Sequence, residues 1–330
     1  MREIAVVSGK GGTGKTIVAG ALAVLAGRAA DGGAVFADCD VDAANLALIL
    51  RPSLREEHVF TGPRRAVIDP GLCTGCGACA AACRSGALAD PDGGGASAAS
   101  ESDTARPPVV DALSCEGCGI CSHVCPVGAV RMEEIPGGKW FISDTPHGPL
   151  VHARLEPGGE NSGKLVTIVR NKAREEAASQ GRRLILIDGP PGIGCPALAT
   201  LAGADMALVV TEPTVAAIHD LERVLVVCRH FRVRTVVAMN RCDLDEENSR
   251  RIEEHCAASG AEVVARLPYD PAVVRAVVSG VTVVEHSTRE IARRIRRLWD
   301  RLSDLVREGS GEPAGGPGAS DENVVRESRR

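Results

Sequence analysis

Short apolar runs alternate with longer stretches of helical character through most of the chain. The apolar runs cover residues 4–7, 34–37, 184–187, 206–210 and 233–239. The helical stretches cover roughly residues 16–30, 164–180, 214–229 and 246–260. Continuous apolar runs are typical of parallel strands that are buried on both faces, because the helices between them cover the sheet. The pattern predicts a doubly wound α/β domain with a mainly parallel sheet.

This alternation stops between about residues 66 and 133, where Cys, Gly and Ala dominate. Within that segment, residues 90–108 are rich in Gly, Ser and Asp, which predicts a solvated loop. We therefore expect a discontinuous domain made of residues 1–65 and 134–307, with an inserted module at 66–133. Residues 308–330 are rich in Gly, Ser, Glu and Arg and are expected to be a disordered tail.

Composition narrows the class of protein. A chain of 330 residues with 44% hydrophobic content can bury a sizeable core. The net charge of -5 and the aromatic content of 2% argue against nucleic acid as a partner. No apolar run reaches the ~18 residues of a membrane span, and no apolar leader precedes the first strand. We expect a cytoplasmic protein that does not bind membranes.

A phosphate-binding loop follows the first apolar run. It fits G-x-x-x-x-G-K followed by Ser or Thr over Gly9, Lys10, Gly11, Gly12, Thr13, Gly14, Lys15 and Thr16. The glycines let backbone N–H groups approach phosphates at a helix N-terminus, and Lys15 supplies a positive charge to them. The Thr16 hydroxyl is a ligand for Mg²⁺. The alternative is a glycine-rich turn without a ligand.

The K-G-G-T-G-K-T form of this loop resembles the deviant Walker A motif of the MinD/ParA family of P-loop ATPases. Segments similar to that family follow in order at residues 38–40, 45–46, 188–192, 239–241 and 267–270. The resemblance implies a nucleotide-dependent homodimer in which Lys10 reaches the nucleotide of the other subunit. Taken alone, Lys10 is equally consistent with a solvated charge.

Polar residues at the ends of the apolar runs are the candidates for ATP chemistry. Asp40 is expected to position the attacking water, with Lys10 and Lys15 as the other catalytic residues, and Asp38 is the weaker candidate. Asp188 ends its strand as a Walker B acid does, so it is expected to hold Mg²⁺ with Thr16. Asn240 offers a donor and an acceptor to adenine, and Pro268 is expected beside the nucleotide. The alternative for each is a turn or capping residue.

The inserted segment contains two runs of four cysteines with the spacing of bacterial ferredoxins, C-x-x-C-x-x-C-x-x-x-C. In that arrangement the fourth cysteine of each run binds the other cluster. This spacing assigns one 4Fe-4S cluster to Cys73, Cys76, Cys79 and Cys125. It assigns the second to Cys115, Cys118, Cys121 and Cys83. Zinc is the alternative, and Arg84 stands where ferredoxins usually have proline.

Other cysteines fall outside these runs. Cys195 follows Asp188 at the offset of a cluster-ligating cysteine in the related nitrogenase iron protein, but the second ligating cysteine has no counterpart, so we expect a buried small residue. Cys39, Cys228, Cys242 and Cys256 are expected in core or helix positions.

Two segments leave alternatives open. The stretch from Asn161 to Lys164 is either a helix start capped by Ser162 or a segment that responds to nucleotide. The stretch 289–306 predicts an amphipathic helix that packs on the sheet, or else contacts a membrane as the terminal helix of MinD does.

As a whole, the chain resembles MinD-superfamily ATPases that contain an inserted ferredoxin domain. The resemblance implies an ATP-driven dimeric switch with ATP, Mg²⁺ and two 4Fe-4S clusters. Its output would be electron transfer to a redox partner, or assembly of a metal cluster on an apo-metalloprotein. The alternatives are an iron–sulfur carrier ATPase and a positioning ATPase in which the clusters are structural.

Overall fold

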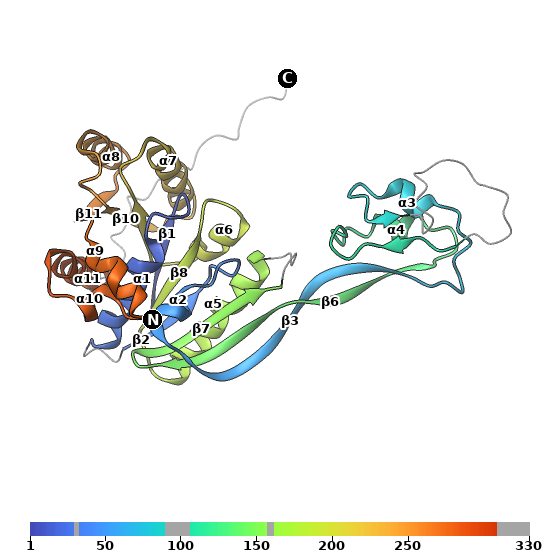
Figure 1. Cartoon of the computed structure of the whole chain (residues 1–330), viewed down its shortest axis with the longest axis horizontal. Coiled ribbons are helices and arrows are strands. Elements are labelled where there is room, and N and C mark those ends of the chain that lie inside the picture. The colour runs from blue at the N-terminus through green and yellow to red at the C-terminus, as the bar shows by residue number, and fades with distance from the viewer. Residues whose placement is uncertain (30–32, 90–105, 157–161, 309–330) are drawn as a thin grey trace, which may run out of the picture.

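The computed structural model describes residues 1–29, 33–89, 106–156 and 162–308, which are built around a nine-stranded sheet (Figure 1). From edge to edge, the strands are β11 (Glu262–Leu267), β10 (Arg234–Asn240), β9 (Met206–Thr211), β1 (Arg2–Ser8), β8 (Leu184–Pro191), β2 (Ala34–Asp38), β7 (Gly148–Leu155), β6 (Val130–Thr145) and β3 (Ser53–Ile68). Every neighbouring pair from β11 to β7 is parallel, whereas β6 and β3 are antiparallel. The prediction of a mainly parallel α/β sheet is confirmed.

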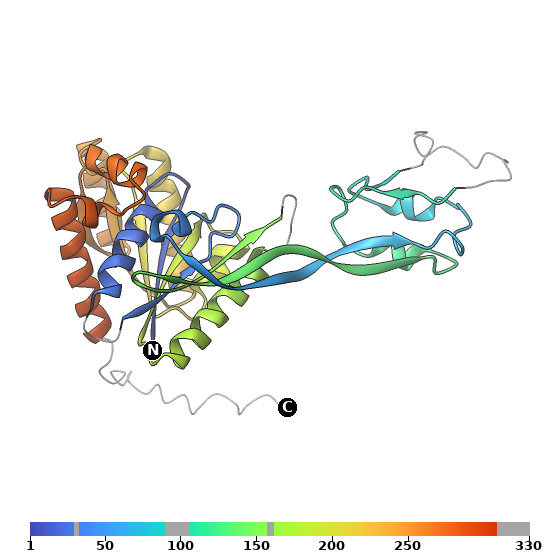
Figure 2. The ribbon, with the colours of Figure 1, turned by 60° about the horizontal axis from the view of Figure 1, so that its bottom comes forward.

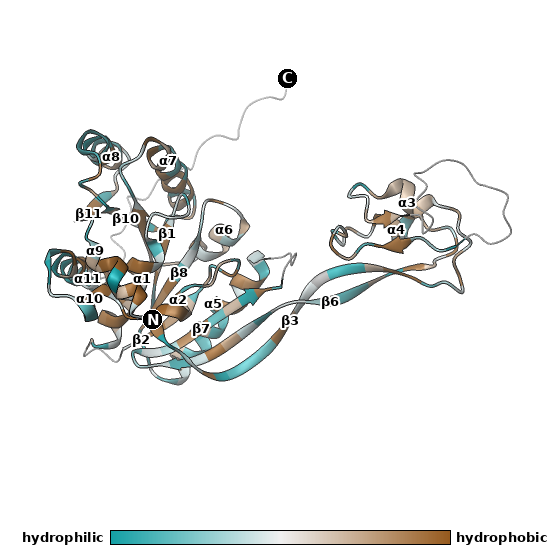
Figure 3. Ribbon diagram, in the orientation of Figure 1, coloured by the Kyte–Doolittle hydropathy of each residue, from teal (hydrophilic) through white to brown (hydrophobic). Residues whose placement is uncertain are grey.

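Helices cover both faces of the sheet (Figure 2). One face carries α1 (Lys15–Gly27), α2 (Leu46–Leu50), α9 (Pro271–Val278), α10 (Val283–His286) and α11 (Glu290–Glu308). The other carries α5 (Ser162–Ser179), α6 (Cys195–Leu201), α7 (Val215–His230) and α8 (Glu246–Ala258). In β1, Ile4 and Val6 are buried on the first face and Ala5 and Val7 on the second, which explains the continuous apolar run at residues 4–7 (Figure 3).

The last described helix, α11, packs on the core. Its buried residues recur at helical spacing and are Ile291, Ala292, Ile295, Leu298, Leu302 and Leu305. The packed alternative for this helix is therefore confirmed. Within the described part of the chain, none of the helices combines the length and the apolar character that crossing a bilayer requires.

Strands β3 and β6 form a long arm. They pair with each other from Ser53 opposite Asp144 to Ile68 opposite Val130, whereas β7 pairs with β6 only as far as Gly138. Beyond that point the two strands leave the sheet as a two-stranded ribbon with a small cysteine-containing unit at its far end (Figure 1). The expected domain boundaries at 65 and 134 fall inside this ribbon.

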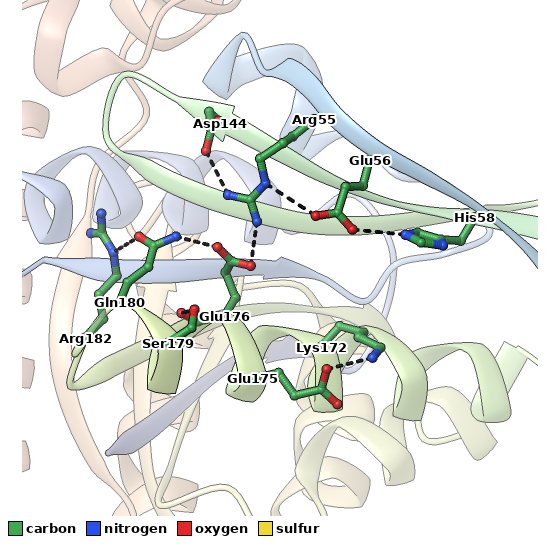
Figure 4. A network of polar contacts seen from close by, with 10 residues as sticks. All are labelled: Arg55, Glu56, His58, Asp144, Lys172, Glu175, Glu176, Ser179, Gln180 and Arg182. Atoms are coloured by element: carbon green, nitrogen blue, oxygen red, sulfur yellow. Dashed lines mark hydrogen bonds and ion pairs between the residues drawn. The ribbon is translucent and has the colours of Figure 1, made fainter.

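The root of the arm is fixed on α5 (Figure 4). Arg55 of β3 donates a hydrogen bond to Glu176 of α5 over 2.5 Å. Trp140 of β6 stacks on His58 with ring centroids 3.9 Å apart, and the ammonium of Lys172 lies 5.7 Å from the centroid of the Trp140 ring. The hydrogen bond and the cation–π contact therefore hold the first part of the arm against α5, and the stacked rings join its two strands.

Four of the five strands predicted from apolar runs lie within β1, β2, β8 and β9, and the fifth, at 233–239, overlaps β10 but begins one residue before it. Helix α5 begins at Ser162, so this residue belongs to the first turn and is not the preceding cap. Its neighbour Asn161 lies outside the described residues. Most of the predicted loop, residues 90–105, and the predicted tail from residue 309 also lie outside them.

Candidate functional site

The phosphate-binding loop connects β1 to α1 at the carboxyl edge of the sheet. Gly12 and Gly14 have φ angles of 83° and 91°, which L-residues with a side chain rarely adopt. Asn240, at the end of β10, donates from Nδ2 to the carbonyl oxygen of Thr13 over 2.8 Å. A Cβ atom at Gly14 would lie 2.3 Å from the same Asn240 nitrogen. Asn240 therefore supports the loop backbone, and its expected contact with adenine stays a prediction.

Lys15 is surrounded by carboxylates at the start of α1. Its Nζ donates to Asp188 Oδ1 over 2.7 Å and lies 3.5 Å from Asp40 Oδ2. Burial opposes the charged form, but the attraction of Asp188, Asp40 and Asp38 outweighs it and raises the pKa of Lys15. The structure thus brings the predicted Lys15, Asp40 and Asp188 together.

Asp38 and Asp40 lie beyond the carboxyl end of β2 with different surroundings. Asp38 is fully buried, and its two oxygens accept the N–H groups of Asp40 at 3.1 Å and Leu46 at 3.0 Å. Burial and the nearby Asp188 raise the pKa of Asp38 well above its usual range. Burial also raises the pKa of Asp40, against the attraction of Lys15. Asp38 shapes the turn, and Asp40 is the carboxylate that borders the Lys15 ammonium.

Asp188, in β8, retains one oxygen without a partner. Its Oδ2 is buried and accepts no hydrogen bond from the residues that the structure describes. A buried carboxylate oxygen without a partner is costly unless a cation or water satisfies it. Thr16 Oγ1 lies 3.4 Å from Lys15 Nζ in the same cluster. The donor set of Asp188 and Thr16 is therefore suited to Mg²⁺, which prefers oxygen ligands.

Lys10 is bound by a residue that the sequence patterns did not indicate. Its Nζ lies 2.8 Å from Glu212 Oε1 and 3.1 Å from Thr214 Oγ1, both just beyond β9. The segment from Thr211 to Thr214 matches no phosphate or metal motif. Its only signal in the sequence is an acidic residue two positions after the apolar run at 206–210. Pro268 directly follows β11, and the sheet register pairs Leu267 with Asn240, so Pro268 and Asn240 lie at the same edge.

The two cysteine runs form two equivalent halves at the end of the arm. Helices α3 (Ala78–Ala82) and α4 (Ile120–Val124) each end just before the last cysteine of their run. Strand β4 (Leu88–Ala89) pairs with β5 (Val109–Val110) as the start of β6 pairs with the end of β3. Glycines with positive φ occupy matching positions in the two halves, namely Gly75, Gly77 and Gly86, and Gly117, Gly119 and Gly128.

A cavity brings cysteines of both runs together. It is lined by Cys83 of the first run and by Cys115, Cys118 and Cys121 of the second. These are the four cysteines that the ferredoxin spacing assigns to one cluster. In the other half, Cys79 is buried, and its pKa is raised by burial and also by the neighbouring Cys73 and Cys76. The first three cysteines of that run therefore also lie close together.

Backbone N–H groups gather around the last cysteine of each run. Ala129 N donates to Cys125 Sγ over 3.2 Å. The pKa of Cys125 is lowered, chiefly by the N–H of Val127. For Cys83, burial acts in the opposite direction, but the Ser85 hydroxyl and nearby backbone N–H groups outweigh it and lower the pKa. A lower pKa favours the thiolate, which is the form that binds iron or zinc.

No group of three or more His, Cys, Asp or Glu side chains in the described part of the chain is arranged to hold a single metal ion. The two assignments of these cysteines, to 4Fe-4S clusters and alternatively to zinc, both stay predictions.

The expectation that Cys195 is buried is wrong. Cys195 is exposed, because it is the first residue of α6 and follows an irregular turn rather than a strand. It lies against the start of α5, where a Cβ atom at Gly163 would be 3.4 Å from the Cys195 Cβ. By contrast, the expected core cysteines Cys39, Cys228, Cys242 and Cys256 are buried.

Comparisons with known proteins place the site in a family. A model of the CobQ/CobB/MinD/ParA nucleotide binding domain matches residues 4–283. The uncharacterized protein MJ0578 of Methanocaldococcus jannaschii is 27% identical over 306 residues, which cover 92% of this chain and 97% of that protein.

Two solved structures have a similar fold at low sequence identity. The cell division ATPase MinD of Pyrococcus furiosus has a TM-score of 0.54 and 18% identity, with 92% of this chain and 99% of that chain covered. The septum site-determining protein MinD of Pyrococcus horikoshii, complexed with Mg-ADP, has a TM-score of 0.54 and 18% identity, with 92% and 97% covered. With its phosphate-binding loop between β1 and α1 and its carboxylates around Lys15, the chain belongs to the CobQ/CobB/MinD/ParA nucleotide-binding family and is an ATPase.

Proposed function

We propose that the chain is an ATP-driven switch of the MinD/ParA type whose arm carries two iron–sulfur clusters. The observation that carries this proposal is the cavity in which Cys83 of the first run lies with Cys115, Cys118 and Cys121 of the second. An exchange of the fourth cysteine between runs is what the bacterial ferredoxin spacing requires. A zinc site built from adjacent C-x-x-C pairs does not require it.

The residues around the phosphate loop have separate roles in ATP hydrolysis. Lys15 exchanges its carboxylate partners for the phosphates of ATP. Asp188 and Thr16 would hold Mg²⁺, which supplies neutralisation of phosphate charge when bound. The departure of Lys15 frees Asp40 to orient the attacking water. Lys10 acts across the interface of a nucleotide-dependent homodimer. The support for this division is the geometry at Lys15, where 2.7 Å and 3.5 Å separate the ammonium from two carboxylates.

On the arm, Cys73, Cys76, Cys79 and Cys125 would hold one cluster and the cavity cysteines the other. Such clusters supply one-electron chemistry when bound, with potentials set by the hydrogen bonds and burial around their sulfurs. Four protein ligands for each cluster favour retention over donation to an apo-protein. The chain would then transfer electrons to a redox partner, or use them to assemble a metal cluster on that partner.

A second candidate function is the positioning of a cargo, with the clusters as structural elements of the arm. The comparisons support this candidate for the ATPase part, because both solved structures described above are cell-division or septum-site proteins. Its ATP cycle requires no communication with the arm. The two functions therefore differ in whether nucleotide changes the properties of the cysteine unit.

Iron analysis of anaerobically purified protein tests the clusters. We expect about eight irons per chain, because each 4Fe-4S cluster binds four cysteines. Cys83→Ser should reduce the iron content to about four and change the visible absorbance, whereas Cys195→Ser, which alters an exposed cysteine outside the runs, should leave both unchanged. Zinc in place of iron, or full iron retention in Cys83→Ser, would contradict the proposed ligands.

Reduction potentials then separate the two functions. We expect the potential of at least one cluster to differ between protein bound to Mg-ADP and protein bound to a slowly hydrolysed ATP analogue, because a switch must couple its two parts. If ATP shifts the reduction free energy, reduction must shift ATP affinity by the same amount. Equal potentials in both nucleotide states would favour the positioning candidate.

A further inference from the structure

Glu212 pairs with two cations from different loops. It lies beyond the carboxyl end of β9, the strand next to β1, and its residue exposure is only 7%. Its Oε1 atom accepts from Lys10 Nζ at 2.8 Å, and its Oε2 atom accepts from Arg241 at 2.7 Å. A buried carboxylate with two cationic partners remains neutralised if one of them leaves.

The second contact of Lys10 is at a helix N-terminus. Thr214 caps α7, and its Oγ1 accepts the N–H of Ala217 at 3.3 Å while also lying 3.1 Å from Lys10 Nζ. The N-terminus of a helix carries partial positive charge, so it does not stabilise an ammonium group. The charge of Glu212 is therefore what holds Lys10 in this place. The Lys10 side chain remains 29% exposed and can move away without opening the core.

We propose that Glu212 is a positioning residue that holds Lys10 within its own subunit until ATP draws the lysine away. This inference rests on the proposed action of Lys10 across the subunit interface. A lysine that is bound to its own subunit is withheld from the partner. ATP carries one more phosphate than ADP, so it competes better with the Glu212 carboxylate for the ammonium. Glu212 thus sets how strongly subunit pairing depends on the third phosphate.

Arg241 limits the free energy that the release of Lys10 requires. After Lys10 leaves, the Arg241 guanidinium still pairs with Glu212, so the buried carboxylate never lacks a cation. Arg241 is held in place because its backbone N–H donates to Asn240 Oδ1 at 3.0 Å. Its backbone has a φ of 52°, in the left-handed region. Removing Glu212 and removing Arg241 should therefore change subunit pairing in opposite directions.

Sedimentation velocity with Mg-ATP over a range of protein concentrations measures the dimer dissociation constant and so tests these opposite effects. Glu212→Gln keeps the shape of the side chain and removes its charge. We expect the equilibrium constant for release of Lys10 to rise about fivefold in each subunit, which is the typical contribution of a partly exposed ion pair. Because both subunits release a lysine, the dimer dissociation constant should fall about 25-fold. Arg241→Met should raise that constant, and Arg241→Lys should restore it towards the parental value.

Two controls separate this inference from its alternatives. The affinity of the monomer for Mg-ADP should be the same in the parent and in all three variants, because ADP lacks the phosphate that draws Lys10 away. An unchanged dimer constant in Glu212→Gln, or a change in the same direction in Arg241→Met, would overturn the inference. So would a loss of Mg-ADP affinity in Arg241→Met as large as its loss of pairing.

Lys10→Ala distinguishes this inference from the proposed function itself. If Lys10→Ala pairs and hydrolyses ATP like the parent, the proposed action of Lys10 is wrong. If Lys10→Ala binds ATP without turnover while Glu212→Gln pairs like the parent, only the role of Glu212 is wrong.

Discussion

Replacing Lys15 with methionine should destabilise the protein even without nucleotide. Lys15 has a side-chain exposure of 6% and lies 2.7 Å from Asp188 and 3.5 Å from Asp40. Lys15→Met keeps most of the side-chain volume but leaves these carboxylates without their cation. Breaking a buried ion pair from one side costs about 3–5 kcal/mol in free energy of unfolding. Since two carboxylates share the lysine and Asp40 borders the surface, we expect the lower end of this range.

Urea unfolding of the nucleotide-free protein measures this effect. A loss of about 3 kcal/mol at a slope of about 3 kcal/mol per M lowers the midpoint by about 1 M. The double variant Lys15→Met/Asp188→Asn should recover most of this loss, because the strongest partner of Lys15 then carries no charge. Lys172→Met is the matched control at a partly exposed lysine, and its effect should stay below about 1 kcal/mol.

The reasoning is refuted if Lys15→Met is as stable as the parent without nucleotide. It is also refuted if the double variant is less stable than Lys15→Met, because the carboxylate charge would then not be the source of the loss. The raised pKa of Lys15 also predicts the direction in which stability changes with pH. Its stabilising contribution is fully present below pH 10.5 and should be lost as the pH rises through the higher value of the folded protein.

Three further predictions concern other residues. Burial lowers the pKa of His152 to about 4, so stability should fall as the pH drops from 6.5 towards 4, where only the unfolded chain takes up the proton. Thermal unfolding at several pH values should show this loss in the parent and not in His152→Gln. Asp40→Ala should accumulate as an ATP-bound dimer, because ATP binds while its attacking water lacks an orienting carboxylate; a monomer under saturating Mg-ATP in size-exclusion chromatography contradicts this. Gly14→Ala should lose ATP binding in calorimetry, because its Cβ would lie 2.3 Å from the amide nitrogen of Asn240 at a φ of 91°. Gly181→Ala, which has a φ of 65° and open space around it, should bind ATP like the parent.

The core of the ATPase could be predicted from the sequence because its signals are local. Each buried parallel strand is a continuous apolar run, and a glycine-rich loop at the end of the first run places Lys15 at a helix N-terminus. Asp188 follows the apolar run at 184–187 and is expected from the sequence to end its strand, but β8 continues to Pro191 because its parallel pairing with β1 extends to Ser8 opposite Pro191. Asp188 nevertheless lies within hydrogen-bond distance of Lys15, as the expected site requires. These inferences required only the period of the pattern and the direction of the strands.

The arm and Glu212 could not be predicted because their signals depend on distant residues. Strand β3 carries Arg55, Glu56 and Glu57 in succession, which lack the apolar alternation of a half-buried strand. These charges are tolerated because the arm is solvated and Arg55 meets Glu176, a residue far along the chain. Glu212 is likewise defined by Lys10 and Arg241, which come from two other loops. The exposure of Cys195 depends on where α6 begins, and a sequence fixes helix ends less well than helix centres.

Strand β3 leads to the cysteine unit and β6 returns from it, and the two strands pair with each other. The cysteine unit can therefore be removed without disturbing the rest of the sheet. Phe60 lies opposite Gly138 in the antiparallel register, at the last point where β6 also pairs with β7. A two-residue Asn-Gly turn joining β3 to β6 just beyond this pair would close a hairpin without shifting the register of any remaining strand. The same junction would accept a longer or shorter ribbon, provided that both strands change by equal numbers of residues. The length of the ribbon and the unit at its end can therefore both change while the nucleotide-binding domain and its site stay the same.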